Sequence, residues 1–554
     1  MRRIFGQPPF TILLLVLLAF AGCQQETTPT APPEATGAPA LQETAPPETP
    51  TEDAPPPDDV PPTDEAQSAP ATASATTAGA PVASDVPDPG LFQLSWQERG
   101  PFEAGLVDPA EARLPQLQGA SVYHMDLTLG SDVSSLTGSE EIYYTNQEDT
   151  ALEEVYLRLF PNLAGGSTTI QGAWINGQTV EPEYELRNSA MRLPLSPALE
   201  PGQSVVLKID FEVDVPIAGG GNYGTFIYDR DILALAHFYP MIAVYDDEGW
   251  NLEIAPESGD VVYADSSLYL VRISAPAGLQ LAASGAEIEG GSDGERQQVT
   301  FAAGPARDFY LAASAGFDVY SEQVGETVVN SYAFPEVEPA AGDVLDWSVD
   351  ALQTFEELFG SYPYTELDVV STPTRALGVE YPGIIVINMD LYDPQATPYP
   401  PVVLESTVAH EVAHQWFYAV VGNDQVDEPW LDESLTQYAT YLYFQETGSS
   451  GDAQGFRQSL VQRWQGVDGE DIPIGQPVAA YEGPEYSAIV YGRGPLFFEA
   501  LAEEMGQDAF HAFVRDYYQT LRWDIATPQR LQSLAEEACG CELDALFEEW
   551  VYGE

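Results

Sequence analysis

Residues 410–433 constrain this chain more than any other part of its sequence. They open with His-Glu-Val-Ala-His, and Glu433 follows His414 after eighteen residues. On a helix, residues four apart lie on one face, so His410 and His414 can bind the same ion. Two imidazoles and one carboxylate leave the fourth position of a tetrahedral site open, which is typical of catalytic zinc. Any fold of this chain must therefore bring two consecutive helices together at one Zn²⁺.

Glu411 lies inside this motif, between the two histidines. The pattern H-E-x-x-H is typical of metallopeptidases, in which the glutamate is the general base. Two of the five histidines of the chain occur in this spacing, and a helix that buried them beside a glutamate without any ligand would be costly in free energy. We therefore expect Glu411 to take a proton from an attacking water.

The length and charge of the chain limit its organisation and its partners. A chain of 554 residues can form two or three domains with their own cores. Its 87 acidic residues against 19 basic ones give a formal net charge of −68. Such a surface repels nucleic acid and anionic lipid head groups, so we expect no nucleic-acid partner. Solubility and adaptation to high salt explain this acidity equally well.

The first 23 residues have the pattern of an export signal. Arg2 and Arg3 precede an apolar run at residues 10–20, which is too short to span a membrane. The run ends in Phe-Ala-Gly-Cys at residues 20–23, which resembles the lipobox of bacterial lipoproteins. The resemblance implies a lipid anchor at Cys23 and a place at the bacterial cell surface or in the periplasm, bound to a membrane. Ordinary signal cleavage is the alternative, because Phe20 stands where this box usually has Leu.

Residues 24–90 consist largely of Thr, Pro, Ala and acidic residues, almost without aromatics. Such a segment cannot bury enough apolar surface to offset the entropy lost on ordering. Its prolines favour an extended chain. We therefore predict a disordered linker that holds the rest of the protein away from the anchor.

The remaining chain changes from strand patterns to helix patterns near residue 336. Alternating runs predict strands at residues 122–128, 140–144, 155–159, 191–195 and 205–213. Helical spacing and boundary residues then predict helices at residues 342–360, 400–422, 431–446, 485–505, 507–521, 528–538 and 543–551, with strands at residues 367–371 and 384–388. The predicted fold is α+β and multidomain, with an antiparallel β domain at residues 91–335 and a mostly helical domain at residues 336–554.

From about residue 359 to residue 551 the chain resembles the aminopeptidase N family of gluzincin zinc peptidases. H-E-x-x-H, eighteen residues and then Glu is the metal pattern of that family. The resemblance implies a thermolysin-like catalytic domain with one Zn²⁺ per chain, held by His410, His414 and Glu433, and Glu411 as the general base. It also implies that the substrates are peptides with a free N-terminus.

The segment Leu-Gly-Val-Glu-Tyr-Pro-Gly at residues 377–383 looks like the exopeptidase motif of the family, whose glutamate binds the α-amine of the substrate. By this resemblance Glu380 is the amine-binding residue. Leu377, Val379 and Tyr381 replace the usual Gly, Met and Asn around it. The alternative is a glutamate at the edge of a strand, exposed to solvent.

The segment Tyr-Ser-Ala-Ile-Val-Tyr-Gly-Arg-Gly at residues 486–494 resembles the part of the family that contains the transition-state tyrosine. Tyr491 is the matching residue, and Arg493 replaces the usual lysine. A phenol at this position would donate a hydrogen bond to the oxyanion that forms when water attacks a carbonyl.

Together these features predict a surface-tethered zinc metallopeptidase, an aminopeptidase that removes N-terminal residues from peptides. One alternative is an endopeptidase with the same zinc site, in which Glu380 does not select free amines. Another is a non-catalytic surface binding protein with a peptidase fold. Near the end of the chain, one residue separates Cys539 from Cys541. We interpret these cysteines as structural and as too close for an easy mutual disulfide.

Overall fold

The computed structural model describes residues 92–219, 221–256, 259–260, 262–448 and 450–553. The chain divides into two units, Met1–Ser74 and Ala75–Glu554, and every described residue belongs to the second. The predicted export signal, Cys23 and the linker at residues 24–90 lie outside the described residues. Within the described ranges, none of the helices combines the length and the apolar character needed to cross a membrane.

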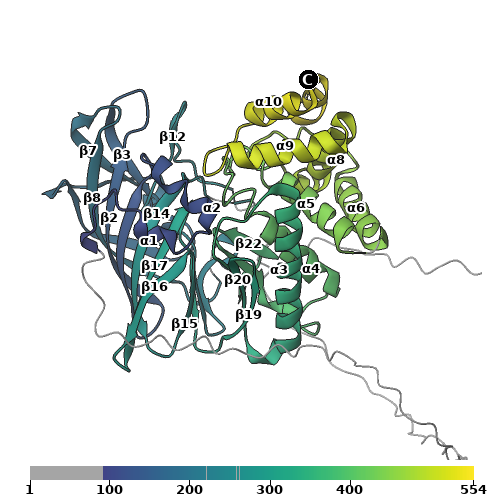
Figure 1. Ribbon diagram of the computed structural model, residues 1–554. Coiled ribbons are helices and arrows are strands. Elements are labelled where there is room, and N and C mark those ends of the chain that lie inside the picture. The colour runs from purple at the N-terminus through teal and green to yellow at the C-terminus, as the bar shows by residue number, and fades with distance from the viewer. Residues whose placement is uncertain (1–91, 220, 257–258, 261, 449, 554) are drawn as a thin grey trace, which may run out of the picture. The chain divides into compact units, whose positions relative to one another are not determined.

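Strands make up most of the described chain before residue 335 (Figure 1). One sheet has the order β16-β17-β14-β1-β2-β8-β4-β5, antiparallel except that β1 runs parallel to β14. Its strands are β1 (Val122–Leu129), β2 (Ser135–Thr145), β4 (Ser167–Ile175), β5 (Gln178–Thr179), β8 (Ser204–Asp214), β14 (Ser267–Pro276), β16 (Ala286–Ser292) and β17 (Arg296–Ala306). In β8 every second side chain from Val205 to Val213 is buried, as in a strand with one face on a core.

Smaller sheets pack against this one. One has the order β11-β3-β7-β6, another has the order β15-β18-β10-β9, and β12 pairs with β13. These strands are β3 (Leu152–Arg158), β6 (Glu183–Glu185), β7 (Ala190–Leu199), β9 (Phe226–Asp229), β10 (Ile232–Leu235), β11 (Met241–Ile242), β12 (Tyr245–Asp246), β13 (Gly249–Trp250), β15 (Gln280–Ala283) and β18 (Leu311–Ser314). Met125, Leu157, Ile209 and Leu235, from three different sheets, are buried in one hydrophobic cluster, so these sheets share a core.

A further sheet carries the strand with Glu380. It has the order β19-β20-β21-β23-β22, made of β19 (Asp318–Val324), β20 (Thr327–Ala333), β21 (Glu366–Thr372), β22 (Gly378–Tyr381) and β23 (Ile384–Asn388). β20, β21 and β23 run parallel, and β22 lies at the edge, antiparallel to β23. The predicted domain boundary at residue 335 falls between β20 and β21 of this sheet.

Helices follow β20 and cover this sheet and each other (Figure 1). They are α3 (Glu338–Phe359), α4 (Pro401–Ala413), α5 (Glu433–Glu446), α6 (Ser450–Trp464), α7 (Glu485–Ala488), α8 (Gly494–Met505), α9 (Gln507–Thr520), α10 (Pro528–Cys539) and α11 (Asp544–Phe547), with π-helical turns at Ile489–Arg493 and Glu548–Tyr552. The short helices α1 (Gly100–Glu103) and α2 (Asp108–Glu111) precede β1, and 3₁₀ turns occur at Leu114–Gln116, Phe160–Asn162, Leu186–Asn188, Asn222–Gly224, Pro335–Val337, Met389–Tyr392, Gln465–Val467 and Val478–Ala480.

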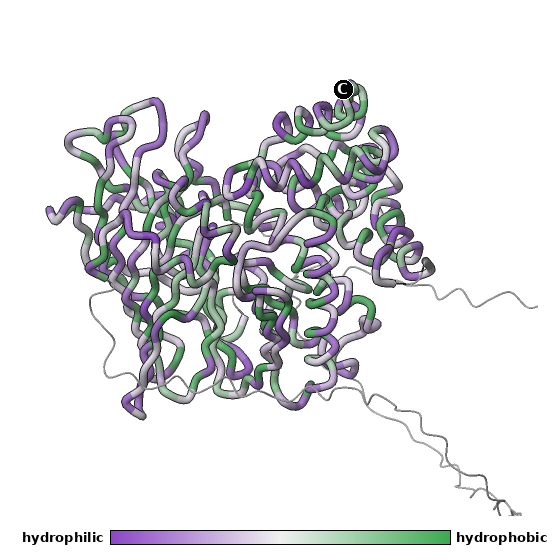
Figure 2. The backbone as a smooth tube through the Cα atoms, in the orientation of Figure 1, coloured by the Kyte–Doolittle hydropathy of each residue, from purple (hydrophilic) through white to green (hydrophobic). Residues whose placement is uncertain are grey.

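Hydrophilic and hydrophobic residues alternate along α8, α9 and α10 (Figure 2), as expected for helices with one face on a core. Phe355 of α3, Val412 of α4 and Tyr443 of α5 are buried in one cluster with Trp416 and Trp430. The predicted order of an antiparallel β domain followed by a mostly helical domain is confirmed.

The predicted helix at residues 400–422 is wrong at its C-terminal end, because α4 ends at Ala413. The buried Arg307, from the segment after β17, donates hydrogen bonds to the carbonyl oxygens of Tyr418 at 2.6 Å and Val420 at 3.1 Å. A continuing helix would need these carbonyls for its own hydrogen bonds. A residue far away in the sequence therefore determines where the chain leaves the helix.

The sequence predicts no helix between residues 446 and 485, but α6 is present there. Gly451 and Gly455 lower the helix propensity of this segment, so its local pattern is weak.

Cys539 and Cys541 form a disulfide, which their spacing does not predict. Gly540 between them has a φ of +62° and turns the chain at the end of α10, which places the two Cα atoms 5.2 Å apart, within the range of disulfides.

Glu140 of β2 is 0% exposed and shares a strand face with Leu136 and Ile142. Neither of its carboxylate oxygens has a hydrogen-bond partner among the described residues. Burial raises the pKa of this carboxyl well above its ordinary value of 4.5. Since the folded-state pKa is the higher one, the stability contribution of the neutral acid is complete below the unfolded-state pKa and is lost as the pH rises through the folded-state pKa.

We expect Glu140→Gln to remove this pH dependence. The free energy of unfolding of the variant relative to wild type should rise by about 1.4 kcal/mol for each pH unit above the ordinary carboxyl pKa, until the folded-state pKa is reached. Urea unfolding at a series of pH values measures this difference. Glu141→Gln, on the opposite face of β2, is the control, and parallel curves for wild type and Glu140→Gln would show that the buried group does not titrate as described.

Candidate metal centre

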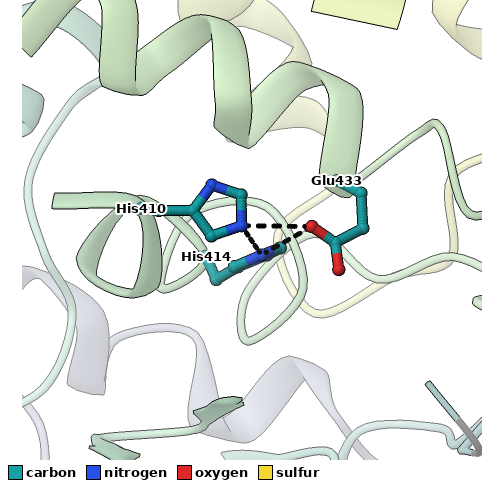
Figure 3. Close-up of side chains that lie close together, drawn as sticks. All are labelled: His410, His414 and Glu433. Carbon is teal, nitrogen blue, oxygen red and sulfur yellow. Dashed lines mark hydrogen bonds and ion pairs between the residues drawn. The ribbon is translucent and has the colours of Figure 1, made fainter. Parts of the chain in front are cut away.

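The side chains of His410, His414 and Glu433 point toward one another (Figure 3). His410 Nε2 lies 3.1 Å from Glu433 Oε2 and 3.2 Å from His414 Nε2, and His414 Nε2 lies 3.3 Å from Glu433 Oε2. The residues with the predicted ligand roles thus form a nearly equilateral triangle of donor atoms, built from the end of α4 and the start of α5.

This triangle is close to the size that zinc requires. Bonds of about 2.0–2.2 Å in a tetrahedral site place ligand atoms roughly 3.3–3.6 Å apart, slightly more than the 3.1–3.3 Å between the donor atoms here. His414 Nδ1 lies 3.0 Å from the carbonyl oxygen of Phe417. Because a carbonyl only accepts, this contact places the proton on Nδ1 and leaves the lone pair of Nε2 directed into the triangle. The donor set therefore fits Zn²⁺.

Asp432 positions Glu433 within this triangle. The Oδ1 atom of Asp432 accepts a hydrogen bond of 2.8 Å from the backbone N–H of Glu433, so Asp432 caps α5 and Glu433 is the first residue of that helix. Between His414 and this cap, Arg307 binds the carbonyl oxygens of Tyr418 and Val420.

A second group of potential ligands shares His414. One ligand atom each of Glu380, His414 and Asp432 lie within 4.8 Å of one another. However, Gln425 Nε2 donates to Glu380 Oε1 at 2.9 Å and to Asp432 Oδ2 at 2.8 Å, and Asn423 Nδ2 donates to Asp432 Oδ1 at 3.2 Å. These carboxylates are already engaged by amides, so the structure favours the His410, His414 and Glu433 set for the metal.

Glu411 is buried at the side of β22, and its Oε2 atom has no hydrogen-bond partner among the described residues. A Cβ atom added to Gly378 would lie 2.5 Å from Cγ and Oε1 of Glu411, so only glycine allows the strand to pass this close. Burial raises the pKa of Glu411 well above its ordinary value, and the negative charges of Glu380 and Glu433 add to this, while His414 opposes it. The arrangement favours a carboxyl that can hold a proton.

Glu380 is not exposed, although β22 is an edge strand. Its side chain is buried, with Gln425 hydrogen-bonded to Oε1, so the alternative of a solvent-exposed strand-edge glutamate is wrong. Beside it lies a pocket that is also lined by Tyr223, Asp260 and Tyr381. A carboxylate in this position can pair with a cationic group held in the pocket.

Tyr491 lies in the π-helical turn after α7, and its hydroxyl donates a hydrogen bond to Glu433 Oε1. The ring centroids of Tyr491 and His410 are 6.0 Å apart. Arg493, two residues later, instead donates to the carbonyl oxygen of Trp550 at 2.7 Å and so ties this turn to the end of the chain. The structure thus brings Tyr491, and not Arg493, to the predicted ligands.

The carboxylates of the centre raise the pKa of His414. Burial alone would lower the pKa of His414, but the carboxylates of Glu380, Glu433 and Glu411 outweigh burial and raise this pKa well above its ordinary value. The pKa of His410, by contrast, is lowered by burial. Without a metal, the carboxylates therefore favour a proton on His414, and a metal cation replaces that proton when it binds.

Sequence reasoning missed several polar residues here. Gln425 lies between the two halves of the ligand pattern, and its amide joins Glu380 to Asp432. Asp260 lies outside every strand and helix, and burial and then Glu380 raise its pKa well above its ordinary value. Arg463 lies on α6, the helix that the sequence did not predict. Of these residues, only Gln425 lies within residues 410–433, so only its position in the sequence indicated that it lies near the ligands.

Comparison with known proteins places the site within a region that matches a known family model. Residues 344–550 match the family model described as "Peptidase family M1 domain". The chain is 25% identical over 273 residues to Aminopeptidase 2 of Candida albicans, a match that covers 47% of this chain and 29% of that protein. It is 27% identical over 228 residues to Aminopeptidase B of Homo sapiens, covering 39% and 34%. The chain thus spans about a third of the length of these curated relatives.

A solved structure shares the fold. A mutant of the M1 zinc metallopeptidase from Deinococcus radiodurans superposes with a TM-score of 0.58 at 20% identity, covering 78% of this chain and 95% of that one. A further structure of that protein, with a TM-score of 0.57 at 20% identity over 78% and 94% of the two chains, is bound to a Tyr-Ser-Ala substrate. At this identity the likeness shows the fold.

We expect His414→Ala and Glu433→Ala to lose Zn²⁺. Removal of a ligand should weaken binding by more than the roughly 10- to 100-fold that loss of a second-shell partner costs. Metal analysis after dialysis against a weak chelator measures the zinc content per chain, and circular dichroism checks folding. His511→Ala, on α9, is the control. Full zinc content in Glu433→Ala together with loss of zinc in Asp432→Asn would assign the metal to the second group instead.

Proposed function

We propose that this chain is a zinc-dependent aminopeptidase that removes N-terminal residues from peptides, because residues 344–550 match the model of the peptidase family M1 domain. The observation that carries the proposal is the triangle of His410, His414 and Glu433, with Glu411 and Tyr491 beside it. Two features support peptide substrates. These are the buried carboxylate of Glu380 next to a pocket, and the peptide bound to the structural relative.

The residues around the triangle have different roles in hydrolysis. When bound, Zn²⁺ supplies a Lewis acid that polarises a carbonyl and lowers the pKa of water. The carboxylate of Glu411 takes a proton from the attacking water and returns it to the leaving amine. The hydroxyl of Tyr491, which here donates to Glu433, donates to the oxyanion as it forms.

Glu380 limits the reaction to chain ends. Its carboxylate is held by Gln425 and faces the pocket lined by Tyr223, Asp260 and Tyr381. An α-ammonium group bound there places the first peptide bond at the triangle, because consecutive residues span at most about 3.3–3.6 Å each. The family motif around Glu380 supports this role for it.

The cellular place of the protein is also part of the proposal. The apolar run and the Phe-Ala-Gly-Cys sequence at residues 20–23 support a lipid anchor at Cys23, and the Pro-rich composition of residues 24–90 supports a tether. The enzyme would then act on peptides at the bacterial cell surface or in the periplasm.

We expect Glu411→Gln to bind Zn²⁺ and fold normally but to hydrolyse peptides at least about 100- to 10,000-fold more slowly, which is the usual contribution of a general base. Steady-state kinetics together with metal analysis measures both properties. Glu405→Gln, earlier on α4, should remain active. Near wild-type hydrolysis in Glu411→Gln would contradict this mechanism.

We expect a peptide with a free N-terminus to be cleaved and its N-acetylated form to resist cleavage. Glu380→Gln should lower kcat/KM for the free peptide by about 10- to 100-fold, because a hydrogen bond to a charged group contributes about 1.5–3 kcal/mol. Mass spectrometry of the products shows which bonds are cut. Equal rates for free and acetylated peptides would favour the endopeptidase alternative.

A further inference from the structure

A positive charge lies beside the metal centre on the side of Tyr491. The Cζ atom of Arg463, near the end of α6, lies 5.7 Å from the ring centroid of Tyr491. Its Nη1 atom donates a hydrogen bond of 3.1 Å to Ser487 Oγ. Burial lowers the pKa of Arg463, while Tyr491 and Glu433 nearby raise it, and a guanidinium stays charged in proteins. The guanidinium of Arg463 therefore places one positive charge next to a centre that otherwise contains several carboxylates.

Most N–H groups of the Arg463 guanidinium have no hydrogen-bond acceptor among the described residues. It carries five N–H groups, yet the part of the chain that the structure describes offers it one hydrogen bond and no ion pair. Arg457, six residues earlier on the same helix, has a carboxylate partner in contrast, because two of its nitrogens each lie 2.6 Å from a carboxylate oxygen of Glu499. In a chain with 87 acidic residues, an arginine without a carboxylate partner next to the reaction centre points to an anionic ligand.

Arg463 and Glu380 act on different parts of the centre. Glu380 lies with His414 and Asp432, on the β22 side. Arg463 lies against Tyr491, whose ring is next to that of His410. A peptide with free ends has an ammonium group at one end and a carboxylate at the other. These two charges are complementary to the carboxylate of Glu380 and the guanidinium of Arg463. If Glu380 holds the ammonium group, the guanidinium is on the side of the leaving group.

We propose that Arg463 binds a carboxylate of the substrate on the leaving-group side of the scissile bond, so that peptides with a carboxylate at this place are preferred. This inference rests on the proposed aminopeptidase function. A guanidinium matches a carboxylate through two parallel hydrogen bonds. The carboxylate is the C-terminus of a di- or tripeptide or an acidic side chain directly after the scissile bond, and the experiment separates these two sources.

The test compares substrates that differ only in this carboxylate. The dipeptide Leu-Ala is compared with Leu-Ala-NH₂, and Leu-Asp-NH₂ with Leu-Asn-NH₂. Each pair is measured with the zinc-loaded full chain, with Arg463→Met, with Arg463→Lys and with the control Arg457→Met. For wild type and the control we expect kcat/KM to be higher for the carboxylate member of at least one pair by roughly tenfold, mostly through KM.

Arg463→Met should remove this preference, because kcat/KM should fall for the carboxylate substrate and stay nearly unchanged for its amide. Arg463→Lys should restore part of the preference. A preference in the first pair identifies the C-terminus, and one in the second pair identifies the side chain. Two outcomes overturn the inference: absence of any preference in wild type, or an equal loss of kcat for both members of a pair in Arg463→Met, which would mean that Arg463 only supports Tyr491. Failure of wild type to cleave any of these peptides would instead contradict the proposed function.

Discussion

The centre of this protein depends on two imidazole nitrogens that face each other. Nε2 of His410 and Nε2 of His414 are 3.2 Å apart, with a carboxylate oxygen of Glu433 at a similar distance from both. Two lone pairs this close are stable only with a cation or a proton between them, and the surrounding buried carboxylates favour positive charge at this point. The requirement for a cation explains why α4 and α5 must meet end to start and why acidic side chains are tolerated in a buried site.

Residues far from the metal pattern hold this geometry. Arg307, from the strand-rich part of the chain, holds the turn that follows α4 and the second histidine by binding its carbonyl oxygens, including that of Tyr418. Gly378 lets β22 pass next to Glu411, which brings Glu380 to the same centre. Gln425 then joins Glu380 to the residue that caps α5. The strand-rich part and the helices therefore build one site together, and Arg463 on α6 lies beside it, next to Tyr491.

What the sequence predicts here follows from local periodicity. Alternation along β1 and β8 and helical spacing along α3 depend on neighbours in the chain, so their existence could be read directly, and the spacing of His410, His414 and Glu433 is itself a local pattern. The end of α4, the burial of Glu380 and the position of Asp260 depend on contacts between distant segments, which no local pattern encodes. The spacing of Cys539 and Cys541 argues against an easy mutual disulfide, yet they form one, because the turn at Gly540 depends on backbone conformation and not on separation alone.

The most direct test of this account is anomalous diffraction from crystals of the zinc-loaded protein, measured on both sides of the zinc absorption edge. The account predicts one strong anomalous peak per chain, within bonding distance of Nε2 of His410, Nε2 of His414 and the carboxylate of Glu433. A peak between Glu380, His414 and Asp432, or the absence of a peak near His410, would contradict it.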